Sequence, residues 1–480
     1  MKEFVQKYKY LFLIFISSSL LFYKSLFVFF TNDDFFFLKV AQAKNIGDFL
    51  NFFNLLKGPD GFGMYRPLTT QVFYFISWKF FNLNPLPLHV ISFLFLFIII
   101  TLIYKLVLNL IGDEKVALIS AFLYAVSATH FGHLYYLATF QELGMTSFVL
   151  LSCLSFLRRK NILSLIFFIL ALLSKETAVI TPILLVLIYL FQVRSINKSV
   201  NIKKLIVTLI PFIVCLFVYL IIRIFFYGFA TGDSYIWDFS LRKLANTSFW
   251  YLLWSLNIPE SLVDFIGSGL SVNPNLFIFW HSQITPIFIF FSSQLVLIAW
   301  TLSKVLLEKE KDEIKNRDLV STFCIIWFLM SLLPVIFLPI HKFTFYLTLP
   351  LIGVVFRIAY LLVTSKVNNI FIGSFLLVWT LTSIFTLKFT IQTNWITQDE
   401  SISERIFIFF KVKQTEYENK KILFVDTTDD KTLPWSPTEV VKTALSTNNF
   451  FEVFYPKLVA NVSYSGKGDV IIKSRQFLGY

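Results

Sequence analysis

Two adjacent acidic residues and an arginine stand out because they interrupt very apolar stretches of the sequence. Asp33 and Asp34 follow the apolar run 10–30, and Arg66 precedes another apolar stretch. A carboxylate at a membrane face suits a general base that takes a proton from a hydroxyl, which speeds a reaction by roughly 10² to 10⁴. Neighbouring side chains diverge by about 100° on a helix and face opposite ways in a strand. We therefore expect one acid to face a reaction, while the other orients the loop or approaches a cation.

Basic side chains occur at the expected outer ends of several membrane spans, although Lys and Arg usually gather on the cytoplasmic side. Guanidinium groups bind phosphates through two parallel hydrogen bonds and stabilise the charge that develops as a phosphate leaves. A single basic residue here is more often an interfacial anchor, but several on one side indicate a site for a lipid-linked phosphate. These residues are Arg66, Lys175, Arg223, His341 and Lys342.

The composition is that of a protein with many membrane spans. Of its 480 residues, 56% are hydrophobic and 19% are aromatic, and the mean hydropathy is +0.72. Soluble domains are about half apolar and about a quarter charged, so this chain has more apolar surface than a globular core can hide. The net charge of +13 comes from short basic clusters between apolar runs. This pattern excludes a nucleic-acid-binding protein and is typical of cytoplasmic loops.

The apolar runs predict about eleven membrane-spanning helices. The first, 10–30, follows a basic start and lacks a small-residue cleavage site, so we expect it to be retained. Basic clusters such as 158–160 and 304–317 all fall on one side of the expected membrane. By the positive-inside rule, the amino terminus is then cytoplasmic in the cell membrane, and the long loops 31–85 and 228–283 are external.

One expected span is too short to cross a bilayer. The apolar segment 162–173 makes about 18 Å of helix, against a hydrocarbon core of roughly 30 Å. It starts at a cytoplasmic basic cluster, so it cannot carry Lys175 and Glu176 to the outer surface, and His130 is expected to lie similarly deep. Polar groups at such depth need a wet or protein-lined cavity. The alternative is that Lys175 and Glu176 pair with each other while the bilayer thins locally.

After the transmembrane part, 1–390, the pattern changes to that of a soluble domain. We expect a small extracytoplasmic α/β domain over 391–480, with no chemistry of its own visible. Ser436 and Glu439 form a capping box with proline at the first helical position, which predicts a helix to about residue 445. The expected strands are 421–426, 450–454, 458–464 and 469–473.

Several short motifs, taken in their order along the chain, resemble those of one family of membrane enzymes. Asp33 and Asp34 match an acidic pair in that family's first external loop, and 65–68 resembles its YRPL segment. The chain looks like a GT-C-type glycosyltransferase over about residues 20–365, most specifically like the membrane half of the O-mannosyltransferases that carry TPR repeats. The other similar segments are 129–133 (an HPxH-like motif), 174–176 (a KE motif), Arg223 with Gly228, and 345–350 (an RYLYLP-like motif).

This resemblance implies a GT-C-like membrane fold in which Asp33 is the catalytic base and Arg66 and Arg223 serve the phosphate of the sugar donor. The chain departs from the family where Phe131 replaces a proline and Phe345 an arginine, and it has no TPR repeats. The remaining candidate site residues are Asp34, His130, His133, Lys175, Glu176, His341, Tyr346, and Lys342 as the nearest substitute for the missing arginine.

The expected function is that of an inverting glycosyltransferase. It would move a sugar, mannose or similar, from a polyprenyl-phosphate donor in the membrane lipid to a hydroxyl of a glycan or protein acceptor on the external face. No cofactor is expected to be required. Asp34 and Glu176 could offer oxygen ligands to a divalent cation, but no metal site is specified by their spacing. The alternatives are a transporter or flippase of lipid-linked or small solutes, and a catalytically inactive membrane scaffold.

Overall fold

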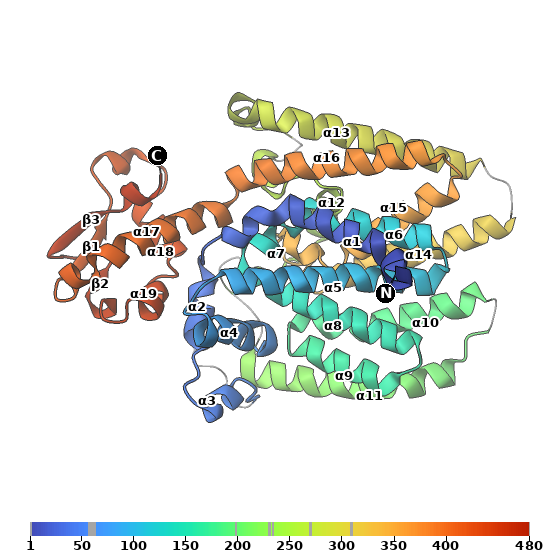
Figure 1. Ribbon diagram of the computed structural model, residues 1–480, viewed down its shortest axis with the longest axis horizontal. Helices are drawn as coiled ribbons and strands as arrows, with labels where there is room; N and C mark the ends of the chain where they lie inside the picture. Colours follow the sequence, from blue (N-terminus) through green and yellow to red (C-terminus); the bar gives the residue numbers. More distant parts are fainter. Residues whose placement is uncertain are drawn as a thin grey trace.

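The computed structural model of the chain describes residues 2–55, 64–196, 199–228, 232, 235–267, 271–307 and 311–479. Parts of the expected loops 31–85 and 228–283, and of the charged link 304–317, lie outside these described residues. Figure 1 shows a long bundle of roughly parallel helices, with a smaller unit of helices and strands at one end.

The structure is built almost entirely from helices. The helices are α1 Lys2–Phe22, α2 Asp33–Val40, α3 Ile46–Asn51, α4 Phe73–Phe80, α5 Leu86–Ile111, α6 Glu114–Ala125, α7 Phe131–Tyr135, α8 Phe140–Leu157, α9 Asn161–Leu172, α10 Thr181–Ser195, α11 Ile202–Ile222, α12 Leu241–Ser255, α13 Asn275–Leu306, α14 Lys311–Leu332, α15 Leu351–Thr364, α16 Asn369–Thr393, α17 Trp395–Tyr417, α18 Pro437–Ala444 and α19 Asn449–Phe454. The strands are β1 Ile422–Val425, β2 Val462–Ser463 and β3 Val470–Lys473.

Local sequence explains where the bundle helices begin and end. α5 has proline in its first turn and stops at Gly112, whose φ of 77° ends the helix in the left-handed conformation that glycine adopts without a steric cost. α6 then begins at once, because the side chain of Asp113 accepts hydrogen bonds from the backbone N–H groups of Lys115 and Val116, at 2.8 and 3.1 Å. The two helices therefore form a tight antiparallel pair within the bundle.

Seven helices among the described residues are long and apolar enough to cross a membrane, and the number is eight if one bent pair counts as a single span. The chain thus folds as a helical membrane protein, with fewer clear spans than the expected total of about eleven. α9 and α15 are apolar but short. The run from residue 114 to 135 is bent by 47° between α6 and the turn before α7. α14 begins with the charged sequence 311–318.

The C-terminal unit contains a small parallel sheet in the order β2-β1-β3. Ile422 of β1 lies opposite both Val462 of β2 and Val470 of β3. The predicted strands at 421–426 and 469–473 are confirmed, as is the helix from residue 437. Of the expected strand 458–464, only β2 at its end is a strand; the residues just before it form a 3₁₀ turn.

The expected strand 450–454 is wrong, because these residues form helix α19. The run of aromatic residues is typical of a strand by residue type. Tertiary contacts favour a helix instead, since one face meets α2 and another meets α17. The rings of Phe450 and Phe35 lie 5.1 Å apart, and those of Phe451 and Phe410 also lie 5.1 Å apart.

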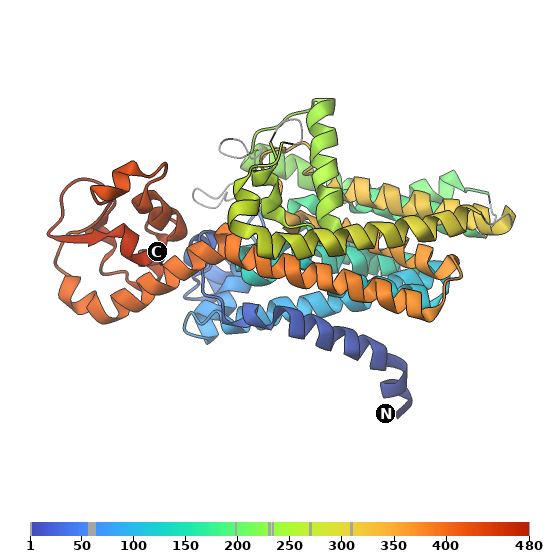
Figure 2. The ribbon, with the colours of Figure 1, turned by 90° about the horizontal axis from the view of Figure 1, so that it is seen from above.

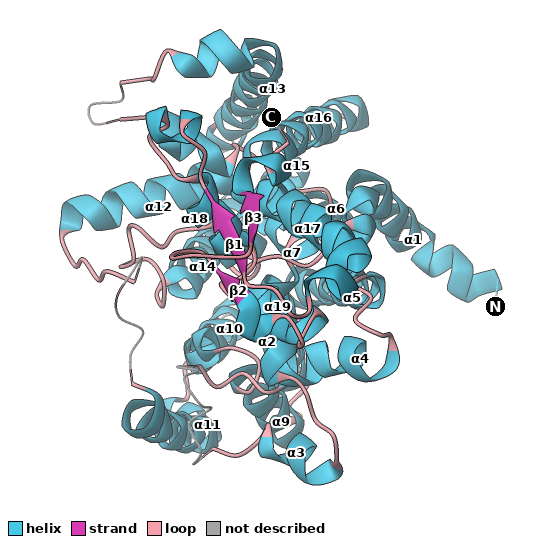
Figure 3. Ribbon diagram, turned by 90° about the vertical axis from the view of Figure 1, so that its left-hand side faces the viewer, coloured by secondary structure: helices cyan, strands magenta, loops and turns pink. Residues whose placement is uncertain are grey.

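The C-terminal unit and helices α2, α3 and α4 lie at the same end of the bundle (Figure 1). Figure 3, viewed from that end, shows the sheet and α17 to α19 in front of the bundle helices, with α2 beside α19. α17 joins the two parts. It follows α16 after a single residue, Asn394, whose side chain caps α17 by accepting a hydrogen bond from the N–H of Ile396 at 2.9 Å. Figure 2 shows α13 and α16 running side by side along the bundle.

Candidate functional site

The two adjacent acids occupy different environments at the start of α2. Asp34 is buried, with 1% of its surface exposed. Its carboxylate accepts hydrogen bonds from the N–H of Thr31, at 3.0 Å, and from the hydroxyl of Tyr74. Asp33 is exposed to solvent, and its backbone N–H donates to the hydroxyl of Tyr136 at 3.2 Å. Asp34 therefore holds the loop in shape, and Asp33 presents a carboxylate.

The protein environment makes both acids harder to ionise. Burial raises the pKa of Asp34 to about 7, even though the hydrogen bond from Tyr74 partly opposes the shift. The side chain of Asp33 reaches solvent, but most of its surroundings are protein. The resulting desolvation raises the pKa of the Asp33 carboxyl, while Tyr136 and Arg66 act in the opposite direction. A carboxylate with a raised pKa is a stronger base once it has lost its proton.

A cavity of about 700 Å³ lies beside Asp33. Its walls come from the start of α2 and from Tyr136, just after α7, on one side, and from α17 and the end of α18 on the other. Asn32 joins these parts, since its N–H donates to the carbonyl of Ala444 at 2.9 Å and its side-chain amide donates to Asp399 at 3.0 Å. The lining residues are Asn32, Asp33, Tyr136, Trp395, Asp399, Lys442, Thr443, Ser446 and Thr447.

Arg66 is buried, and it is paired with Glu176, whose side chain is 31% exposed. Its Nε donates to Glu176 at 2.7 Å, its Nη2 donates to the other oxygen of the same carboxylate, and its Nη1 donates to the side chain of Gln141. The adjoining backbone is fixed as well, because the N–H of Leu68 donates to the carbonyl of Leu173 at 3.3 Å. The loop that carries Arg66 is thus joined to the turn that carries Glu176.

Lys175 and Glu176 do not pair with each other, which corrects the alternative raised from the sequence. Lys175 pairs with Glu142 of α8 at 2.7 Å, and only 6% and 3% of their side chains are exposed. The ammonium group also lies 4.8 Å from the ring centre of Tyr346. Lys175 therefore sits in a protein-lined pocket between α8 and the turn before α15.

Tyr235 lies within electrostatic range of Asp33, Arg66 and Glu176, and it connects the candidate residues. The centre of its ring lies 4.0 Å from that of His341, and the two ring planes are inclined by 32°. Burial lowers the pKa of His341 to about 4, and the charges of Lys175 and Arg66 act in the same direction. Asp33, Arg66, Lys175, Glu176, His341 and Tyr346 thus belong to one neighbourhood, although they come from widely separated parts of the sequence.

Other predicted site residues lie at the margin of this neighbourhood or outside it. Arg223 lies over the ring of Tyr227, 5.6 Å from its centre, and that ring is also 5.6 Å from Tyr65, the neighbour of Arg66. Lys342 is directed elsewhere: its ammonium donates to the carbonyl of Pro339 at 2.7 Å.

Both histidines of the HPxH-like motif are fully buried. His130 contacts the carbonyl of Tyr124 at 2.7 Å, and His133 contacts the hydroxyl of Thr348 at 2.6 Å. They have the environment of core histidines that hold neighbouring turns together, and neither of them lines the cavity beside Asp33.

Several residues of the site are absent from the sequence-based set. Glu142 had a usable signal, since an acid within the apolar stretch 137–157 points to a functional or paired group inside the membrane. Trp395, Asp399 and Tyr235 had no such signal, because their roles depend on contacts with distant segments. Within the ranges that the structure describes, no group of three or more His, Cys, Asp or Glu residues could hold a metal ion.

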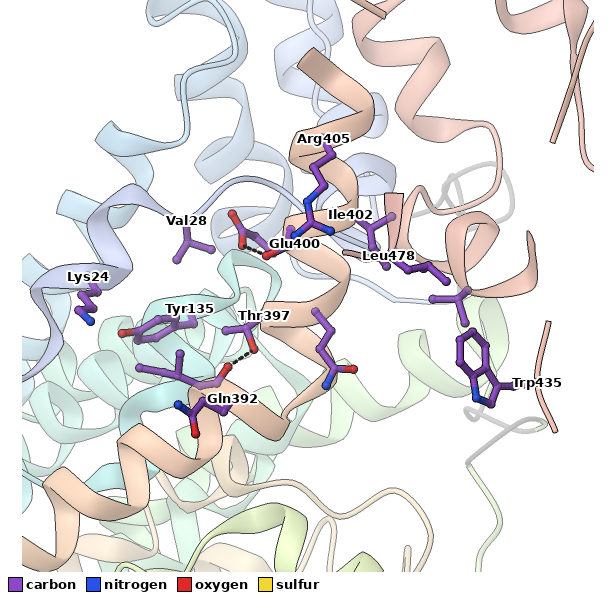
Figure 4. Close-up of a pocket in the computed structure, with 14 residues that line it drawn as sticks. Lys24, Val28, Tyr135, Gln392, Thr397, Glu400, Ile402, Arg405, Trp435 and Leu478 are labelled. Carbon is purple, nitrogen blue, oxygen red and sulfur yellow. Dashed lines mark hydrogen bonds between the residues drawn. The ribbon is translucent and has the colours of Figure 1, made fainter. Parts of the chain in front are cut away.

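A second cavity, of about 620 Å³, lies on another face of α17 (Figure 4). Glu400, next to Asp399, lines it and accepts a hydrogen bond from the N–H of Phe29 at 2.8 Å. Lys24, in the 3₁₀ turn that follows α1, and Arg405 of α17 also line this cavity. Successive acids of α17 therefore face two separate cavities and hold the loop before α2 from two directions.

Comparison with known proteins assigns no family to the chain. No family model, no curated protein and no solved structure matches it. The function has to be argued from the residues of the site.

Proposed function

We propose that this protein is an inverting glycosyltransferase that moves a sugar from a polyprenyl-phosphate donor to the hydroxyl of an acceptor. The observation that carries the proposal is the position of Asp33. Its carboxylate opens into a cavity of about 700 Å³, and the buried cation Arg66 lies within electrostatic range of it. A base beside a roomy cavity, with a cation nearby for a leaving phosphate, is the arrangement that glycosyl transfer from a lipid phosphate requires.

The reaction is a single displacement. The carboxylate of Asp33 takes the proton of the acceptor hydroxyl, and the oxygen attacks the anomeric carbon of the donor sugar. The bond between that carbon and the phosphate oxygen breaks, and its electron pair leaves with the lipid phosphate. Arg66, Arg223 and Lys175 are the cations that would stabilise the growing negative charge. Attack from the side opposite the phosphate inverts the configuration at the anomeric carbon.

The hydrogen bonds of Arg66 limit how it can bind a phosphate. A guanidinium group has five N–H donors, and three of them are used on Glu176 and Gln141. A phosphate therefore has to use the remaining two donors or replace Gln141. Glu176 keeps the guanidinium oriented when the donor is absent.

The position of the site fits a membrane-bound donor. Asp33 belongs to the end of the bundle that carries α2, α3, α4 and the C-terminal unit (Figure 1). A polyprenyl chain stays in the hydrocarbon layer while its phosphate lies at the surface, so a transferase needs its base at one end of the spans. We assign this end to the external face of the cell membrane, with a glycan or protein as the acceptor.

The replacement of Asp33 by Asn tests this proposal. Membranes that contain the Asp33→Asn variant should transfer sugar from radiolabelled polyprenyl-phosphate mannose or glucose at least about a hundredfold more slowly, because the general base is lost. Asp429→Asn, at an exposed position of the C-terminal unit, is the matched control and should keep full activity. Full activity of the Asp33 variant, measured at equal protein levels, removes Asp33 from the mechanism.

A transporter or flippase is the second candidate, and one observation favours it. Glu142 and Lys175 form a buried ion pair, and Glu142 lies within the candidate span 137–157. Ionisable groups inside spans often mark the path of a solute or proton. Proteoliposomes should distinguish the two functions. Movement of a labelled lipid-linked sugar between leaflets, lost in Glu142→Gln and retained in Asp33→Asn, would favour transport.

A further inference from the structure

We propose that the cavity beside Asp33 binds the acceptor, and that the bound part of the acceptor is an uncharged sugar residue. This inference rests on the proposed glycosyl transfer and adds the chemical class of the acceptor. The cavity has walls from both parts of the protein: Asp33 and Tyr136 from the bundle, Trp395 from α17 and Thr443 from the C-terminal unit.

An aromatic pair forms one side of the cavity. The half-buried ring of Trp395 packs edge-on against Tyr136, with the ring centres 5.3 Å apart. A sugar ring has one face of C–H groups that packs well on an aromatic side chain, and hydroxyls around its edge that need polar partners. The hydroxyl of Tyr136 is already engaged by the N–H of Asp33, so the aromatic pair and the base are held together.

The polar groups of the cavity suit hydroxyls better than charges. Two acids, Asp33 and Asp399, face a single lysine, Lys442. That lysine is itself paired with Glu439 at 3.1 Å. An anionic acceptor would therefore meet a negative cavity, whereas sugar hydroxyls can donate to the carboxylates. The remaining polar lining consists of the hydroxyls of Thr443, Ser446 and Thr447.

Three strained backbone positions lie around the same cavity. Eight non-glycine residues among those described have a positive φ, and three of them line this cavity: Asn32 at 47°, Ser446 at 50° and Thr447 at 59°. A β-branched threonine in this conformation is unfavourable unless the surrounding structure imposes it. Strain of this kind persists where a ligand site needs a particular backbone shape. The surrounding structure, and not local preference, therefore holds the turn at Ser446 and Thr447 in its shape at the wall of the cavity.

A peptide acceptor fits this cavity less well. An extended peptide is commonly bound by adding a strand to the open edge of a sheet. The edge strands here are β2 and β3, and none of their residues is among the lining residues of the cavity. A sugar is recognised by aromatic, carboxylate and hydroxyl side chains, and the cavity is lined by side chains of these three kinds.

Binding by the full chain in lipid nanodiscs tests the inference without requiring catalysis. Saturation-transfer NMR would use α-1,2-mannobiose, methyl β-glucoside and a Ser/Thr-rich nonapeptide as probes. At least one sugar should give a signal with the natural chain. The signal should fall at least fivefold in Trp395→Ala and in Thr443→Trp, which fills the cavity from an exposed position. Trp435→Ala is the matched control, because Trp435 lines the second cavity (Figure 4).

The outcomes separate this inference from the proposed function. The acceptor inference is overturned if neither sugar binds, or if sugar binding survives in both cavity variants. It is also overturned if Trp435→Ala reduces sugar binding as much as the cavity variants do, or if only the peptide shows binding that depends on Trp395. Asp33→Asn should lose transfer, because the general base is gone. Sugar binding that depends on Trp395, without transfer from any polyprenyl-phosphate sugar, overturns the proposed function and leaves the sugar site standing.

Discussion

At the scale of single residues, neighbours in sequence have taken separate tasks. Asp33 and Asp34 are adjacent, yet one opens into a cavity and the other is buried among hydrogen-bond donors. Lys175 and Glu176 are also adjacent, and each pairs with a partner from another segment. The same geometric rule accounts for both pairs, because successive side chains diverge on a helix or turn.

The two-point contact between Arg66 and Glu176 leads to a prediction at this scale. Arg66→Lys keeps the charge but loses the planar pair of hydrogen bonds. We expect the variant to lose roughly 1–2 kcal/mol of stability, and Arg66→Ala to lose about 3 kcal/mol, since it leaves Glu176 without its partner. Thermal unfolding in detergent measures the stability, and kcat/KM for sugar transfer should fall in both variants.

Arg242→Lys is the matched control, because Arg242 is exposed on α12. It should unfold and react like the natural protein. Unchanged unfolding of both Arg66 variants would show that the ion pair does not hold the loop.

At the scale of elements, α17 is the support of the candidate site. Its acids Asp399 and Glu400 each bind the loop before α2, through Asn32 and through the N–H of Phe29. The end of α18 adds a third contact, at the carbonyl of Ala444. The position of Asp33 therefore depends on helices more than 360 residues away, since Asn32 and Asp399 are separated by 367 positions.

The stabilisation that α17 and its acids give to the loop before α2 is expected to weaken as the pH rises. Burial raises the pKa of Asp399 to about 6, and of Asp34 and Glu400 to about 7. These values exceed those of unfolded chains, near 4, so the folded protein binds the protons more tightly. The resulting stabilisation is complete below about pH 4 and is lost as the pH rises through 6 to 7.

The lowered pKa of His341 acts in the opposite direction, so the acids of α17 are tested by a difference between two proteins. Between pH 5 and pH 8 the melting temperature of the natural protein should fall relative to that of the double variant Asp399→Asn, Glu400→Gln, which lacks two of the three acids. A difference between the two melting temperatures that stays constant at pH 5, 6, 7 and 8 contradicts this prediction.

At the scale of the whole molecule, the arrangement places the site and the C-terminal unit at one end of a membrane bundle (Figure 1). Gln141, at the start of α8, contacts Arg66 at this end. Arg159, which follows α8, lies about 27 Å further along at 1.5 Å per residue. The turn at Arg159 therefore belongs to the opposite end of the bundle.

Cysteine labelling tests this arrangement. Single cysteines at Lys44 and Lys467 should react with a membrane-impermeant maleimide from the same side of sealed vesicles, and a cysteine at Arg159 only from the other side. All three positions are exposed. Cys153 and Cys324 are buried, so Cys215→Ser provides the background. If the cysteines introduced at positions 44 and 467 are labelled from different sides, the C-terminal unit cannot contribute to the cavity.

Composition and apolar runs are enough to identify a helical membrane protein, because long apolar runs have few stable environments other than a bilayer. Local patterns also located the acidic pair and the first and third strands of the C-terminal sheet, since turn and strand signals are local. The folded arrangement was needed to show which acid faces a cavity, that Lys175 pairs with Glu142, and that 450–454 is a helix. These outcomes depend on contacts between distant segments, and a local pattern does not record which segments will meet.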